Sequence, residues 1–167
     1  KYGHSLMDFE LKYNNFFIII IGLDETLILV IISLSLGFII SIPFSIARAS
    51  SNKILSNSVY YYVFVIRGTP LLVQIYLIYF GLGTIPAVRE SFLWIVLKEP
   101  FWCGVIALVI NTVAYTTEIF RGGIESVTKG QIESCKSLGM NKFTMYAKII
   151  LPCAFRQALP GYGNEMI

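Results

Sequence analysis

The chain has 167 residues, of which 56% are hydrophobic and 14% are charged, and its formal net charge is +3. Soluble domains carry about 25% charged residues, and a soluble core of this length could not hide so much apolar surface. The composition therefore excludes an ordinary soluble domain and predicts a membrane protein. The three cysteines, an odd number in apolar or basic segments, argue against a disulfide framework.

The first predicted membrane span covers residues 26–46, which include no charged side chain. At 1.5 Å per residue, a helix of this length spans about 30 Å, the thickness of the hydrocarbon core of a bilayer. A shorter apolar stretch, residues 16–23, comes before it and is divided from it by Asp24 and Glu25. We interpret that stretch as an interfacial lead-in rather than a signal peptide, because acidic residues precede it and no Ala-x-Ala cleavage site follows. Residues 1–25 are therefore expected to be an extracellular or interfacial N-terminal segment.

The second predicted span covers residues 59–82, and the third covers residues 101–120. Residues 67–70, Arg-Gly-Thr-Pro, interrupt the second span. We expect its helix to break or kink there, because proline cannot donate the helical hydrogen bond and restricts the residue before it.

Lysine and arginine are distributed unevenly around these spans. Eight of them lie after the first span or after the third, and four lie on the other side, leaving aside Arg67. Positive residues favour the cytoplasmic side of a membrane. Residues 121–158 are therefore expected to form a cytoplasmic segment, and the N-terminus is expected to lie outside.

Several polar residues fall inside the predicted spans. A charge such as that of Arg67 costs at least about 2.5 kcal/mol at the bilayer centre, so it needs a partner or a wet cavity. Arg67 either lines a solute path or gate, snorkels to the headgroups, or forms a structural ion pair. On the third span Asn111, Tyr115 and Glu118 recur at i, i+4 and i+7 and share one helix face. This face either lines the path or holds the helices together, and Glu118 is the expected counter-charge for Arg67.

The segment after the third span predicts two short helices around a glycine corner. Residues 131–138 can form the first helix, ended by Gly139 in the left-handed conformation, and Asn141 can cap the second. Pro152 is expected to close the second helix. An apolar face at i, i+3, i+4 and i+7 is formed by Phe143, Tyr146, Ala147 and Ile150. By pattern alone, the segment either docks a partner or is an amphipathic hairpin on the membrane surface.

The spacing in this segment resembles the signature of the permease subunits of type I ABC importers. That signature begins with an acidic residue and two small residues. Three residues of any type and a Gly follow, then nine residues of any type and an Ile, and then one residue of any type and Leu-Pro. The corresponding residues here are Glu133, Ser134, Cys135, Gly139, Ile149, Leu151 and Pro152. Ser-Cys stands where the family usually has Ala-Ala, and both pairs are small.

The residues at further positions resemble those of the polar amino acid permeases. These permeases handle glutamine, arginine, lysine, ornithine, histidine, cystine and similar solutes. The similar positions are Gly22, Leu23, Thr26, Leu27, residues 67–74, Ala114, Tyr115, Glu118, residues 121–124, Gly130, Gln131, Pro160, Asn164 and Glu165. The resemblance implies an all-α integral membrane protein with a type I ABC importer transmembrane domain at residues 26–167. Because the complete core has five spans, we expect about three spans and the coupling-helix segment here, in a fragment that lacks the last spans.

The resemblance also implies a transport subunit rather than an enzyme. The coupling helix would dock on a cytoplasmic ABC ATPase dimer through Glu133, Ser134, Cys135, Leu138 and Gly139. A solute path or gate would be lined by Arg67, Thr69, Gln74, Asn111, Tyr115 and Glu118.

The other implied partners are a second permease subunit, identical or related, and an extracellular amino acid binding protein, at a bacterial-type cytoplasmic membrane. The chain has no Gly-x-x-x-x-Gly-Lys-Ser/Thr phosphate loop. We therefore expect MgATP on the partner ATPase and no cofactor, metal or catalytic residue in this chain, whose one histidine is His4. The alternatives are an importer for another small solute such as methionine, an ATP-independent channel or secondary transporter, and a membrane scaffold without transport activity.

Overall fold

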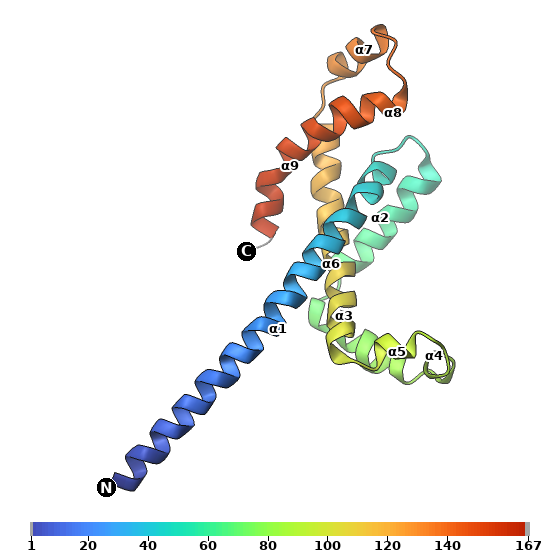
Figure 1. The fold of residues 1–167 in the computed structure, drawn as a ribbon. Helices are drawn as coiled ribbons and strands as arrows, with labels where there is room; N and C mark the ends of the chain where they lie inside the picture. Colours follow the sequence, from blue (N-terminus) through green and yellow to red (C-terminus); the bar gives the residue numbers. More distant parts are fainter. Residues whose placement is uncertain (1, 166–167) are drawn as a thin grey trace.

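The computed structural model describes the backbone of residues 2–165 and the side chains of residues 22–164, and this part is helical without strands. The elements are α1 (Tyr2–Arg48), α2 (Lys53–Arg67), α3 (Leu71–Tyr76), the π-helix η1 (Leu77–Gly81), α4 (Pro86–Arg89), α5 (Trp94–Leu97), α6 (Pro100–Glu125), α7 (Lys129–Ser137), α8 (Lys142–Met145), the π-helix η2 (Tyr146–Ile150) and α9 (Leu151–Glu165). α1, α2 and α6 pack against one another in the middle of the molecule, and α9 packs on α6 (Figure 1).

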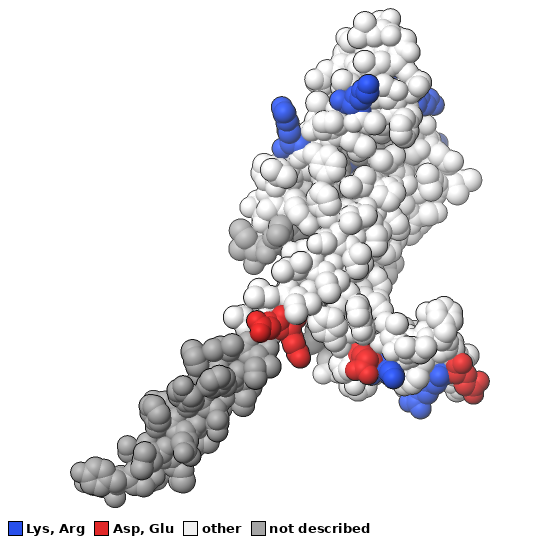
Figure 2. All heavy atoms as spheres, in the orientation of Figure 1, with Lys and Arg blue, Asp and Glu red and all other residues white. Residues whose placement is uncertain are grey.

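The two ends of the molecule differ in charge. α7 and α8 lie at one end and α3, α4 and α5 at the other (Figure 1). On the face drawn in Figure 2, the charged side chains at the α7–α8 end are lysines and arginines, whereas acidic side chains lie toward the opposite end, where some basic side chains accompany them. This asymmetry is the one that the sequence predicts for a membrane protein with a basic cytoplasmic segment.

Two helices in the described part of the chain are long and apolar enough to cross a membrane: Gly22–Arg48 of α1, and α6. α2 and the α3–η1 segment pass the same test together, with a bend of 100° between them, and form a third span if they are counted as one. α2 ends at Arg67 and the helix resumes at Leu71. The predicted all-α membrane fold is confirmed, and so is the predicted break at residues 67–70.

Asp24 and Glu25, which divide the N-terminal apolar stretch from the first predicted span, do not interrupt the helix. α1 runs through both residues as one helix from Tyr2 to Arg48. The two side chains are exposed, and carboxylates that project from a helix leave its backbone hydrogen bonds intact. Residues 16–23 therefore belong to the same helix as the first span, although the side chains of residues 16–21 lie outside the described ones.

α1 packs against α6 through a stripe of small side chains. Ser33, Ser41 and Ser45 are almost completely buried, and with Gly37 they recur at every fourth position, on one helix face. A Cβ atom on Gly37 would lie 2.6 Å from Cγ2 and 2.7 Å from Cβ of Thr112 on α6. Only glycine therefore permits this approach, and small residues are typical of helix contacts in membranes.

An aromatic cluster joins α1, α6 and α9. The ring centroid of Phe38 on α1 lies 5.4 Å from that of Phe120 on α6. On α9, the rings of Phe155 and Tyr162 lie 5.8 Å and 5.2 Å from that of Phe38. Aromatic pairs at such distances contribute about 0.5–1.5 kcal/mol each beyond the area they bury. The cluster therefore holds α9 in place against both long helices.

The predicted end of the second short helix, the one after Asn141, at Pro152 is wrong. α8 continues through η2 into α9, so Pro152 lies inside a helical run. The wider π-turn includes Lys148, whose carbonyl would otherwise meet the proline ring. Because the π-turn changes the angle between residues before and after it, the apolar face also differs from the predicted one. Phe143 and Ala147 are exposed, and Met145 is buried instead.

We expect Gly37→Ala to destabilise the protein, although alanine is the better helix former by about 1 kcal/mol. The added methyl group overlaps Thr112, and overpacking typically costs about 1–3 kcal/mol. Thermal unfolding of the purified full-length protein in detergent should show a lower midpoint. Gly22→Ala is the matched control, because a Cβ on Gly22 meets no described atom within 4 Å. Equal midpoints for the two variants would contradict the close contact.

Candidate functional site

A buried glutamine donates hydrogen bonds to backbone carbonyls at the break between α2 and α3. The last carbonyls of a helix lack partners within it, and inside a membrane they must be paired by protein or water. Gln74, only 6% exposed, supplies the donor. Its Nε2 lies 2.8 Å from the Ile66 carbonyl oxygen, 3.1 Å from the Thr69 carbonyl oxygen and 2.9 Å from Thr69 Oγ1. The break is therefore compatible with the interior of a membrane protein.

Two hydrogen bonds attach this broken span to α6. Asn111 Nδ2 donates to Gln74 Oε1 at 3.3 Å. The Tyr62 hydroxyl on α2 donates to the carbonyl of Ile110 at 2.6 Å. Three residues predicted for the solute path, Thr69, Gln74 and Asn111, are thus brought together in one hydrogen-bonded network that positions the break.

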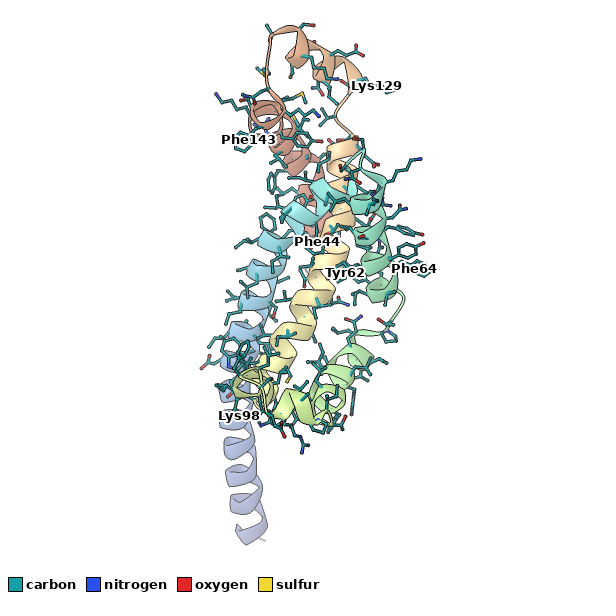
Figure 3. All side chains as sticks on the ribbon, turned by 90° about the vertical axis from the view of Figure 1, so that its right-hand side faces the viewer. Phe44, Tyr62, Phe64, Lys98, Lys129 and Phe143 are labelled. Carbon is teal, nitrogen blue, oxygen red and sulfur yellow. The ribbon has the colours of Figure 1, made fainter. Side chains whose placement is uncertain are left out.

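The other three predicted path residues, Arg67, Tyr115 and Glu118, line a pocket of about 410 Å³ between α2 and α6. The guanidinium carbon of Arg67 lies 4.9 Å from the ring centroid of Tyr115. The remaining wall is formed by Tyr60, Val63, Phe64 and Gly68. Figure 3 shows Tyr62 in the middle of the helical bundle and Phe64 on the outer side of α2. The pocket offers a cation, a carboxylate and aromatic faces to a small molecule.

The predicted ion pair between Arg67 and Glu118 is wrong. Glu118 Oε1 lies 3.3 Å from Arg48 Nε, and Glu118 Oε2 lies 2.7 Å from Arg121 Nε. The reason is the direction of the helices. α1 and α6 both end at the basic end of the molecule, so Arg48 lies level with Glu118. α2 runs the other way, so Arg67 at its end lies farther from the basic end, although its side chain is exposed.

Arg48 is the residue of this site that the sequence analysis missed. Its Nη1 donates to Ser56 Oγ at 2.9 Å, and Ser56 Oγ donates to the Arg48 carbonyl at 2.7 Å. The same guanidinium lies 5.0 Å from the ring centroid of Tyr60. Arg48 therefore links α1, the start of α2 and Glu118 on α6. The sequence does carry a signal for this pair, because Arg48 and Glu118 lie near the ends of two predicted spans on the same side of the membrane.

The predicted glycine corner is confirmed. α7 begins with a capping box, in which Thr128 Oγ1 accepts from the Gln131 N–H and Gln131 Oε1 accepts from the Thr128 N–H. Gly139 after α7 has a φ of 71°, the left-handed conformation that favours glycine. Asn141 caps α8, because its Oδ1 accepts from the Thr144 N–H at 2.8 Å.

The residues predicted to dock an ATPase differ in exposure. Glu133, Ser134 and Gly139 are exposed, and Leu138 is 75% exposed. Cys135 is only 6% exposed. It packs in a hydrophobic cluster with Ile124, Val127, Met145, Ile150 and Ala154. Cys135 therefore attaches α7 to α6 and α9, while its neighbours remain open to a partner.

The described residues contain no group of three His, Cys, Asp or Glu side chains that could hold a metal ion. Cys103 and Cys135 are buried and Cys153 is exposed, and all three are free thiols.

Comparison with known proteins identifies the family. Residues 33–167 match the family described as "Binding-protein-dependent transport system inner membrane component". The chain belongs to this family. The predicted resemblance to ABC permeases is thereby confirmed, and the chain is an integral component of the inner membrane.

Individual permeases and a solved structure are also similar. The nopaline transport system permease protein NocM of Agrobacterium fabrum is 46% identical, over 96% of this chain and 67% of its own length. The histidine/lysine/arginine/ornithine transport system permease protein HisM of Escherichia coli is 43% identical, over 87% of this chain and 62% of its own length. The crystal structure of an amino acid ABC transporter with histidines matches with a TM-score of 0.66 at 39% identity, covering 84% of this chain and 62% of that one. The permease chain thus spans about two thirds of the length of these relatives.

We expect Gln74→Met to destabilise the permease, because it removes the donor to the Thr69 carbonyl and the acceptor of the Asn111 amide. The Ile66 carbonyl keeps the N–H and the hydroxyl of Thr69 as donors. A buried polar group left without a partner costs about 1–3 kcal/mol. Gln74→Glu should also destabilise, since an ionised carboxylate accepts hydrogen bonds but cannot donate them. Thermal unfolding of the full-length permease in detergent measures both. Gln157→Glu is the matched control at an exposed position, and a Gln74→Met variant as stable as the parent would show that the amide does not close the break.

Proposed function

We propose that the chain is the permease subunit of an ATP-binding-cassette importer that carries a polar amino acid across the cytoplasmic membrane. The observation that carries this proposal is the family match over residues 33–167. The names of similar permeases support the solute class: one is a nopaline permease, and another is a permease for histidine, lysine, arginine and ornithine. The last four are amino acids with basic side chains, so solutes of that kind are the first to test.

In this proposal α7 docks on a cytoplasmic ABC ATPase dimer that binds MgATP. Support comes from the exposure of Glu133, Ser134 and Leu138 on one side of α7. The cluster around Cys135 supports a transmitting role, because it connects the other side of α7 to α6 and α9. A second permease subunit, identical or related, and an extracellular amino acid binding protein complete the proposed transporter.

The proposed orientation places the α7–α8 end in the cytoplasm and the α3–α5 end outside. The concentration of lysine and arginine at the α7–α8 end supports it (Figure 2), because positive residues favour the cytoplasmic side. The same orientation gives the ATPase access to α7.

We place the solute path at the pocket between α2 and α6. An amino acid carries a carboxylate and an ammonium group. Arg67 could bind the carboxylate, and Tyr115 with Glu118 could bind a cationic group. In this arrangement Thr69, Gln74 and Asn111 would hold the broken span that forms one wall of the path.

The proposal predicts ATP-dependent uptake of a polar amino acid. The full-length permease, with its ATPase and binding protein, would be reconstituted in proteoliposomes and tested with arginine, lysine, histidine and glutamine. We expect accumulation of at least one of them that requires both ATP and the ATPase. Methionine is the control solute. Uptake without the ATPase, or uptake of methionine alone, would contradict the proposal.

The glycine corner at Gly139, between α7 and α8, is called here the coupling corner. We expect Gly139→Val to lower ATP-linked uptake without preventing membrane insertion. The left-handed conformation costs a residue with a Cβ roughly 1–2 kcal/mol, and a β-branched side chain is especially unfavourable there. Gly139→Asn is the control, because asparagine adopts this conformation more readily. Normal ATP-linked uptake by Gly139→Val would count against the docking role of the corner.

A further inference from the structure

Two adjoining pockets lie at the basic end of the molecule, between the α1–α2 turn and the α7–α8 corner. One has a volume of about 450 Å³ and the other about 300 Å³. Both are lined by Ile46, Lys142 and Tyr146. Because they share these walls, we treat them as one groove, called here the α8 groove.

The larger half of the α8 groove carries two basic side chains among mostly apolar ones, which include Ile132, Met145 and Ile150. Lys136 from α7 and Lys142 from α8 line it, together with Ser50 and Ser51 of the α1–α2 turn. No acidic side chain lines either half. The ion pairs among the described side chains involve arginines, and neither lysine takes part in one. The larger half therefore presents two positive charges that are not neutralised, together with two hydroxyl groups, and this combination suits an anion.

The smaller half of the α8 groove is apolar. Beside the shared residues it is lined by Phe143, Ala147 and Leu151. Phe143 is 82% exposed and lies on the outer side of α8 (Figure 3). Ile46 lies near the end of the span Gly22–Arg48, so this half opens where α1 leaves the hydrocarbon core. An apolar surface at that depth suits an acyl chain.

We propose that the α8 groove binds one anionic phospholipid. Its phosphate would lie between Lys136 and Lys142, and one acyl chain would cover Phe143 and Leu151. Two lysines and two hydroxyl groups beside a continuous apolar wall match the two chemical parts of such a lipid, and the cytoplasmic leaflet supplies anionic lipids. The bound lipid would contact the α1–α2 turn, α7 and α8 together, and so would hold the coupling corner against the membrane. This inference depends on the orientation of the chain but not on the identity of the solute.

Native mass spectrometry of the full-length permease tests the headgroup site. Phosphatidylglycerol would be titrated against phosphatidylcholine with the same acyl chains, and we expect one site that prefers phosphatidylglycerol. A juxtamembrane lysine contributes about 1 kcal/mol to binding of anionic lipid, equivalent to about a fivefold change in affinity. Lys136→Gln with Lys142→Gln should therefore weaken phosphatidylglycerol binding about thirtyfold. The matched control is Lys129→Gln with Lys148→Gln, which removes the same charge outside the groove; an equal loss in both double variants would overturn the site.

Two further measurements distinguish a lipid from the other possible occupants. Phe143→Ser should weaken binding of both lipids, whereas inorganic phosphate should not displace phosphatidylglycerol. Displacement by phosphate would reduce the site to a simple anion site and overturn the proposal. The proposal also fails if Lys136→Gln with Lys142→Gln weakens ATPase binding but leaves lipid binding intact, because the groove would then belong to a protein interface. All these variants change exposed side chains, so the fold is expected to be retained.

Discussion

The close approach of α1 to α6 is the contact on which the rest of the structure depends. α6 is the central helix, and α1, α2, α3 and α9 all pack on it. In a membrane, lipid solvates apolar side chains as well as another helix does, so shape rather than apolar burial must specify the contact. Gly37 opposite Thr112 provides that shape. Because α1 is held there, Arg48 at its end reaches Glu118 on α6.

The polar residues of the bundle serve two different needs. Thr69, Gln74 and Asn111 pair the backbone at the break and attach it to α6. Arg67 and Tyr115 instead border the neighbouring pocket. A helix break inside a membrane is costly unless its carbonyls are paired. Thr69, Gln74 and Asn111 therefore stabilise the break beside the pocket, although none of them lines the pocket. A polar residue in a span is therefore weak evidence for solute contact until its hydrogen bonds are known.

The features that could be predicted from the sequence are mostly local. The break at residues 67–70, the left-handed Gly139 and the Asn141 cap depend on the residue type and its immediate neighbours, and each was predicted correctly. The spans themselves follow from long apolar runs. The family signature, which spans the coupling corner, was also recognisable because its spacing is local.

The features that could not be predicted depend on how the helices pack. The partner of Glu118 depends on the relative depth of three helices, and sequence order does not give that depth. The π-turn at residues 146–150 changes which side chains face inward, so a periodicity of 3.6 residues misplaces Phe143. The burial of Cys135 depends on contacts with Ile124 of α6 and Ala154 of α9. These two residues lie outside α7, so the local sequence around Cys135 does not indicate either contact.

The cluster around Cys135 has a mechanical consequence for the whole bundle. Separating α7 from α6 and α9 would expose this cluster to water, and Ile46 and Ala49 of α1 pack against it as well. α1 is also joined to α6 by the contact of Gly37 with Thr112 and to α9 by the ring of Phe38. A displacement applied to α7 would therefore be resisted by three helices together, so that the glycine corner acts as part of the bundle and not as a free loop.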